Sequence, residues 1–84
     1  MILKIKYNFQ TKGFFMIYHL KEEYIELHKL IKFLDLVDSG ADAKMIVADG
    51  HVTRNGEIEL RKRAKIRVGD KLVIGDVTIE VEAD

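Results

Sequence analysis

The spacing of apolar residues changes twice along the 84-residue chain, and these changes constrain the fold more than any single motif. Residues 3–10 alternate between apolar and polar side chains, which is the period of a half-buried strand. Over residues 24–34 the apolar side chains return every three or four positions, which is typical of an amphipathic helix. After Gly50 the alternation returns. A chain of this length has room for one packed core, so the pattern predicts a single α+β domain.

The N-terminal segment predicts a hairpin. Residues 3–10 form its first strand, residues 11–13 read as a turn, and residues 14–20 are apolar enough to return as a second strand. A different interpretation is that Met16 is an internal start and the residues before it have no packed role. We therefore expect residues 1–20 to be an N-terminal extension and residues 21–84 to be the main domain.

Two short helices are predicted in the middle of the chain. The first covers roughly residues 26–35, and its apolar stripe consists of Tyr24, Leu27, Leu30, Ile31 and Leu34. The second begins at Ser39, because Ser39-Gly-Ala-Asp42 has the Ser-x-x-Asp form in which the hydroxyl caps a free N–H and the carboxylate lies in the first turn. It ends at Gly50, a residue type that favours the left-handed position after a helix. The aromatic rings of Tyr24 and Phe33 could stack on bases, but their place near the stripe favours the core.

The second half of the chain predicts strands. Asn55-Gly56 is a dipeptide that tolerates positive φ and makes tight hairpin turns. Two further strands, residues 72–74 and 77–81, flank Gly75-Asp76. The expected fold is therefore two short helices packed on a small, mostly antiparallel β-sheet, with a possible N-terminal strand or hairpin.

Positive charge is concentrated between residues 60 and 71, which contain six of the 14 Lys and Arg residues of a chain whose formal net charge is zero. Residues 44–71 are positive as a block, whereas residues 72–84 carry only acidic charges. One positive face on a small domain indicates a polyanionic partner, above all nucleic acid, although a solvated loop would look the same. The residues expected on this face are Lys44, Arg54, Arg61, Lys62, Arg63 and Lys65, joined by Lys29 and Lys32.

Several kinds of site are not expected. The chain contains no Cys, so disulfides and thiolate metal sites are excluded. The three histidines are far apart in sequence and are expected at the surface, and Ser39 is better explained as a helix cap than as a nucleophile. No apolar run reaches the roughly 20 residues of a membrane span. We therefore expect a cytoplasmic protein with no metal, no cofactor and no enzymatic activity.

Four segments together resemble, in order and spacing, the ribosomal-protein-S4-like RNA-binding domain with its alpha-L motif. The likeness is greatest to the stand-alone bacterial members of the YbcJ and YaaA type, and it covers about residues 24–81. The segments are Tyr24–Lys32, Ser39–Lys44, Gly50–Gly56 and Arg61–Asp70. Each is common alone, but four in register make the resemblance specific.

The resemblance implies that the two helices and the following hairpin form an RNA-contacting face. Ser39 and Lys44 would then lie near phosphates at the start of the second helix, and Asn55 would lie at the hairpin with Arg54. The chain departs from the family at Gly40, where many members have arginine. Other departures are His28, where aspartate is frequent, and Arg54, where an apolar residue is usual.

The sequence thus predicts an RNA-binding protein that recognises structured RNA, such as ribosomal RNA or ribosomal particles, mainly through its phosphates. The predicted RNA-binding residues are Lys29, Lys32, Ser39, Lys44, Arg54, Asn55, Arg61, Lys62, Arg63 and Lys65. Two alternatives remain open: a protein-interaction module that uses the hairpin or an exposed sheet edge, and an accessory RNA-binding subunit of an RNA-modifying enzyme.

Overall fold

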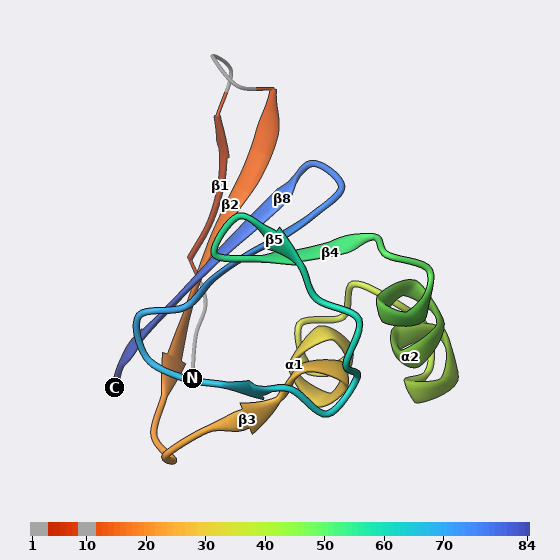
Figure 1. Ribbon diagram of the computed structural model, residues 1–84. Helices are drawn as coiled ribbons and strands as arrows, with labels where there is room; N and C mark the ends of the chain where they lie inside the picture. The colour runs from red at the N-terminus through yellow and green to blue at the C-terminus, as the bar shows by residue number, and fades with distance from the viewer. Residues whose placement is uncertain (1–3, 9–11) are drawn as a thin grey trace.

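The computed structural model of the protein describes residues 4–8 and 12–84, with side chains from residue 12 onward. Within these described residues, two helices and eight strands follow one another (Figure 1). They are β1 (Lys4–Asn8), β2 (Gly13–Leu20), β3 (Ile25–Glu26), α1 (Leu27–Phe33), α2 (Gly40–Ala48), β4 (Val52–Arg54), β5 (Glu57–Ile58), β6 (Lys65–Ile66), β7 (Lys71–Ile74) and β8 (Val77–Ala83). No helix in the described part of the chain is long and apolar enough to span a membrane.

The main sheet has six strands in the order β1-β2-β8-β7-β4-β5. All neighbouring strands run antiparallel except β2 and β8, which run parallel. A second, two-stranded sheet pairs β3 with β6. Figure 1 shows both helices on the same side of the molecule, away from the end of the β1–β2 hairpin. The predicted α+β fold with a mostly antiparallel sheet is confirmed.

The N-terminal hairpin is present, although residues 3 and 9–11 of the prediction lie outside the described part. Strand β2 pairs with β8 from Phe14 to Leu20, and the amide of Phe14 donates a hydrogen bond to the Asp76 carbonyl (2.8 Å). Gly13 permits this approach, because a Cβ there would lie 2.5 Å from the same carbonyl oxygen. The expected domain boundary after residue 20 stays a prediction.

The core lies between the helices and the main sheet. Four residues of the predicted helix stripe, Leu27, Leu30, Ile31 and Leu34, are buried. Outside α1, β2 contributes Met16, Tyr18 and Leu20, the middle strands contribute Val52, Leu72, Ile79 and Val81, and α2 contributes Ala43 and Val47. The core therefore draws on both helices and on strands from β2 to β8.

The prediction that Tyr24 and Phe33 are core residues is wrong. Tyr24 precedes α1, which begins only at Leu27, and its side chain is 37% exposed. Phe33 lies in the last turn of α1 and is 50% exposed, with one edge against the ring of Tyr18 at a centroid distance of 5.7 Å. Both rings lie at the margin of the core, so their exposed surface is accessible to a ligand.

The predicted helix cap and turns are confirmed. The Ser39 hydroxyl accepts a hydrogen bond from the Asp42 amide (3.1 Å), which satisfies one of the free N–H groups at the start of α2. Gly50 has φ +81° just after α2. Asn55 and Gly56 have φ values of 53° and 91°, as a tight hairpin between β4 and β5 requires.

Candidate nucleic-acid interface

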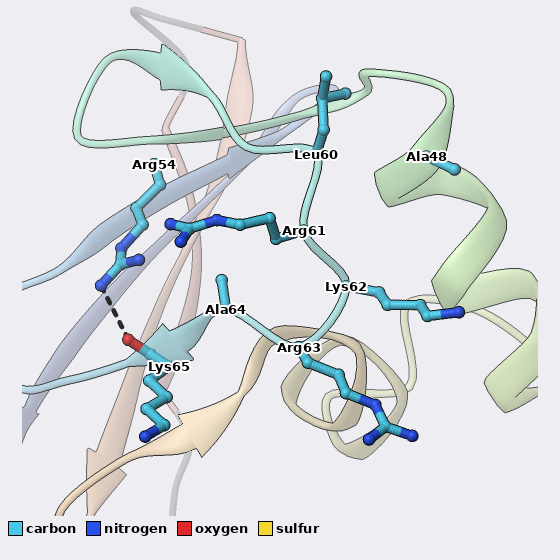
Figure 2. A pocket seen from close by; sticks show the side chains of 8 residues that line it. All are labelled: Ala48, Arg54, Leu60, Arg61, Lys62, Arg63, Ala64 and Lys65. Atoms are coloured by element: carbon cyan, nitrogen blue, oxygen red, sulfur yellow. Dashed lines mark hydrogen bonds between the residues drawn. The ribbon is translucent and has the colours of Figure 1, made fainter.

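A groove of about 820 Å³ lies beside the loop that connects β5 to β6 (Figure 2). Five of the ten predicted RNA-binding residues line it, which is the largest group that the fold brings together. The lining residues are Ala48, Arg54, Leu60, Arg61, Lys62, Arg63, Ala64 and Lys65. Hereafter this feature is called the basic groove, and residues 60–65 are called the basic loop.

The basic loop is fixed in place by its own backbone. The carbonyls of Lys62 and Ala64 accept hydrogen bonds from the His28 and Leu27 amides, both at 2.9 Å. These donors are free N–H groups at the start of α1, where no side chain caps the helix. The side chain of Ala64 is buried, and Lys65 pairs with Glu26 between β6 and β3. The charged side chains of the basic loop therefore project from a backbone that is anchored to the start of α1 and to β3.

Arg54 is a structural residue of the groove. Its Nη2 donates to the Lys65 carbonyl (2.8 Å) and to Asp70 Oδ2 (2.9 Å), and its Nη1 lies 3.5 Å from Glu59 Oε1. Only 22% of the side chain is exposed. These contacts join β4 to the chain around β6. Because two carboxylates already compensate the charge of Arg54, little of its guanidinium remains for a ligand.

Asp70 is the centre of this hydrogen-bond network. Burial would raise the pKa of Asp70, but hydrogen bonds from the Arg67 amide (2.8 Å), Asn55 Nδ2 (3.0 Å) and Arg54 outweigh it and lower the pKa overall. Asn55 also accepts a hydrogen bond from the Lys71 amide (2.9 Å) through its side-chain oxygen. The predicted RNA-binding residue Asn55 therefore uses both ends of its amide within the fold.

Arg61 is paired and accessible at once. Its Nε and Nη2 donate to the two oxygens of Glu59 at 3.0 and 3.2 Å, yet 75% of its side chain is exposed. Glu59 is 8% exposed, and the hydrogen bonds from Arg61 hold its pKa below the ordinary value despite that burial. Part of the guanidinium thus remains open to solvent while one edge is held by the carboxylate.

Lys62, Arg63 and Lys65 are the free cations of the groove. All three are exposed, and within residues 12–84 none of them forms an ion pair. Figure 2 shows that Lys62 extends toward α2, whereas Arg63 extends in front of α1. The Nζ of Lys65 lies 5.0 Å from the centroid of the Tyr24 ring. These side chains can each neutralise one phosphate without first giving up a carboxylate partner.

Comparison with known proteins identifies the fold. The S4 domain family matches residues 18–82. The chain belongs to the S4 domain family. The "Putative RNA-binding protein YbcJ" of Escherichia coli K12 is 36% identical over 63 residues, which cover 75% of this chain and 90% of the relative. The resemblance inferred from the four sequence segments is confirmed.

Two solved structures are similar to this S4 domain. The solution structure of E. coli YbcJ, described as having an alpha-L motif involved in RNA-binding, gives a TM-score of 0.63 at 35% identity and covers 80% of this chain and 86% of YbcJ. The 30S ribosomal protein S4e of Thermoplasma acidophilum gives a TM-score of 0.58 at 25% identity. That match covers 69% of this chain but 31% of the ribosomal protein.

The remaining predicted residues do not line the basic groove of the S4 domain. Lys44 lies one helical turn before Ala48 on α2, so it shares the helix face that borders the groove. Lys29 lies 3.7 Å from Glu26 Oε1, and Lys32 is in the last turn of α1. The hydroxyl of Ser39 is engaged in its cap. Their role in RNA binding stays a prediction.

Glu26 and His28 form a second pair beside the loop, with Glu26 Oε1 3.0 Å from His28 Nε2. This hydrogen bond, with smaller contributions from Lys29 and Arg63, holds the pKa of Glu26 below its ordinary value although burial opposes it. Only 12% of the His28 side chain is exposed, so the interpretation of this histidine as a surface residue is wrong. Within residues 4–8 and 12–84 no group of three potential metal ligands occurs.

Sequence reasoning missed two features of this S4 domain interface. Glu59, which pairs with Arg54 and Arg61, could have been found from its spacing, because residues two apart in an extended chain face the same side. Tyr24, which contacts Lys65 and lies 5.7 Å from the guanidinium carbon of Arg67, has no such local signal. Its cations come from β6 and the following turn, far along the chain.

Proposed function

We propose that this S4 domain protein binds structured RNA through the basic groove and acts by docking, without catalysis. The observation that carries the proposal is a set of three cations, Lys62, Arg63 and Lys65, that form no ion pair within residues 12–84 and lie on a loop anchored to α1 and β3. The relative YbcJ, which shares the alpha-L motif, supports RNA as the polyanion.

The three free cations contact phosphates directly in this proposal. Arg61 adds a partial contact from its exposed edge, while Glu59 fixes its direction. Because the loop backbone is already ordered, little conformational entropy is lost when RNA binds. Phosphate contacts of this kind position an RNA without reading its bases, so shape decides which RNA fits.

Ribosomal RNA, free or in ribosomal particles, is the proposed target, and the cytoplasm is the proposed location. Support comes from the structural similarity to a protein of the 30S ribosomal subunit. The two alternatives, edge-strand pairing with another protein and service as an accessory subunit of an RNA-modifying enzyme, remain predictions. For the first, β1 lies at one edge of the main sheet.

The double change Lys62→Glu and Arg63→Glu tests the proposal. We expect at least a tenfold loss of affinity for ribosomal RNA fragments in low salt, because each reversal replaces a phosphate contact with repulsion. The parent's affinity should fall steeply with salt, and the slope for the variant should be smaller by about 0.7 to 0.9 per lost contact. Filter binding over a salt series measures both quantities.

The matched control is Lys12→Glu with Lys21→Glu, which changes the net charge equally. Both residues are exposed and lie outside the basic groove. Lys21 lies 3.7 Å from Asp84 Oδ2, but both side chains of this ion pair are exposed, so its loss should change the stability little. Equal losses of affinity in the two variants would mean that net charge and not the groove governs binding. Arg61→Glu is a poorer test, because it would place a carboxylate against Glu59 and disturb the fold as well as the binding.

A further inference from the structure

The basic groove has an apolar wall as well as a cationic one. Ala48 and Leu60 line the groove, and Ile58 extends the apolar surface beyond it. Ile58 is 64% exposed and Leu60 is 60% exposed. A Cβ at Gly50 would lie 3.9 Å from Ile58 Cγ2 and 3.9 Å from Leu60 Cδ2, so the two side chains converge over the end of α2. Ala48, Ile58 and Leu60 are called the apolar wall below.

The exposure of this wall follows from the position of Glu59. The Glu59 amide donates to the Val52 carbonyl (2.9 Å), and its side chain turns inward to the arginines. Side chains alternate along an extended chain, so the inward Glu59 directs Ile58 and Leu60 outward. Ile58 and Leu60 therefore lie in solvent beside the groove, on a backbone that is hydrogen-bonded to β4.

The two walls together define the chemistry of a ligand. Lys62 extends from the basic loop toward α2, the helix that carries Ala48 (Figure 2). A ligand that satisfies both walls carries an anion and an apolar face within a few ångströms of each other. A nucleotide does so, because its base has an apolar face and its phosphate is one sugar away.

A fully paired RNA helix cannot use the apolar wall. Its bases are stacked on one another, and only the backbone and the base edges are accessible from outside. A bulged or looped nucleotide, in contrast, can turn its base out of the stack. The apolar wall therefore distinguishes RNA with an unpaired nucleotide from a continuous duplex.

We propose that the apolar wall receives the base of one unpaired nucleotide while Lys62 and Arg63 bind the phosphates next to it. The inference rests on the proposed RNA binding and deepens it, since it names bulged or looped RNA as the preferred class. Leu60 is the specificity-determining residue, because it is the larger of the two wall side chains, Ala48 and Leu60, that line the groove.

The test compares two RNA hairpins that share one stem, either fully paired or with a single-nucleotide bulge. The parent protein should bind the bulged RNA about fivefold more tightly, at the lower end of the effect of placing a base on a protein surface. Leu60→Gln should abolish this preference and keep the affinity for the paired stem within about twofold. Val68→Gln is the matched control, because Val68 is also about half exposed but lies outside the groove.

Each other outcome overturns a defined part of the proposal. A parent protein that binds both RNAs equally, or a Leu60→Gln variant that keeps the preference, removes the inference and leaves the proposed RNA binding intact. A parent that binds neither RNA contradicts the proposed function itself. If sedimentation without RNA shows a dimer that Leu60→Gln dissociates, the apolar wall is a protein interface and the inference is wrong.

Discussion

At the scale of single residues, the charges of the candidate interface have two different tasks. Arg54 and Asp70 stabilise the fold, whereas Lys62 and Arg63 are free of carboxylate partners within residues 12–84. Residue type and sequence spacing identified all of these cations as a group. They could not separate the two tasks, because Asp70, one of the partners of Arg54, lies 16 residues away and is brought to it only by the fold.

The variant Asp70→Asn tests the structural task. Its loss of charge weakens the hydrogen bonds to Arg54, Asn55 and the Arg67 amide, so we expect the free energy of unfolding at pH 7 to fall by about 1–3 kcal/mol. Urea denaturation measures it. Asp38→Asn, at an exposed position with no ion pair in the described part of the chain, should change the stability by no more than about 0.5 kcal/mol.

The same variant should alter the pH dependence of stability. The pKa of Asp70 is lower in the folded than in the unfolded protein, so its stabilisation is complete above about pH 5 and is lost as the pH falls toward the lowered pKa. The parent should therefore lose more stability than the variant on acidification. Glu59, whose pKa is also lowered, keeps some acid sensitivity in both proteins. A stability difference that is constant between pH 7 and pH 3 would contradict this account.

At the scale of elements, the features that depend on neighbouring residues were predictable. The cap of α2, its end at Gly50 and the Asn55-Gly56 turn all follow from local backbone chemistry. The β3–β6 pair was not predicted. Each of its strands has only two residues, and the partners are some forty positions apart, so neither strand shows a period of its own. Yet this pair anchors the basic loop.

The contribution of the Ser39 cap to the stability of α2 can be tested by substitution. Ser39→Ala removes the acceptor for the Asp42 amide at the start of α2, and we expect it to lower the free energy of unfolding by about 1 kcal/mol. Ser39→Asp should retain most of the stability, because a carboxylate also caps a helix and interacts well with its dipole. Thermal denaturation compares the two. If both variants bind RNA as the parent does, the hydroxyl serves the fold and not the phosphates.

At the scale of the whole molecule, the parallel pairing of β2 with β8 joins the first part of the chain to the last. The alternation of apolar residues predicted both strands but not their pairing, because nothing in a strand's own sequence names its neighbour in the sheet. The pairing places Met16, Tyr18 and Leu20 in the same core as α1. It therefore bears directly on the boundary expected after residue 20.

Two truncations test whether the hairpin belongs to the folding unit. Removal of residues 1–12 deletes β1 but leaves all of β2, so we expect a folded protein with reduced stability. Removal of residues 1–20 also deletes Met16, Tyr18 and Leu20, which are at most 7% exposed. Burial of each such side chain contributes about 1.5–3 kcal/mol, so their combined loss approaches the 5–15 kcal/mol that stabilises a typical domain. We therefore expect the fragment of residues 21–84 to lack a cooperative unfolding transition in circular dichroism. If that fragment unfolds cooperatively and binds RNA in the salt series described above, the domain is complete without β2, and the boundary after residue 20 is correct.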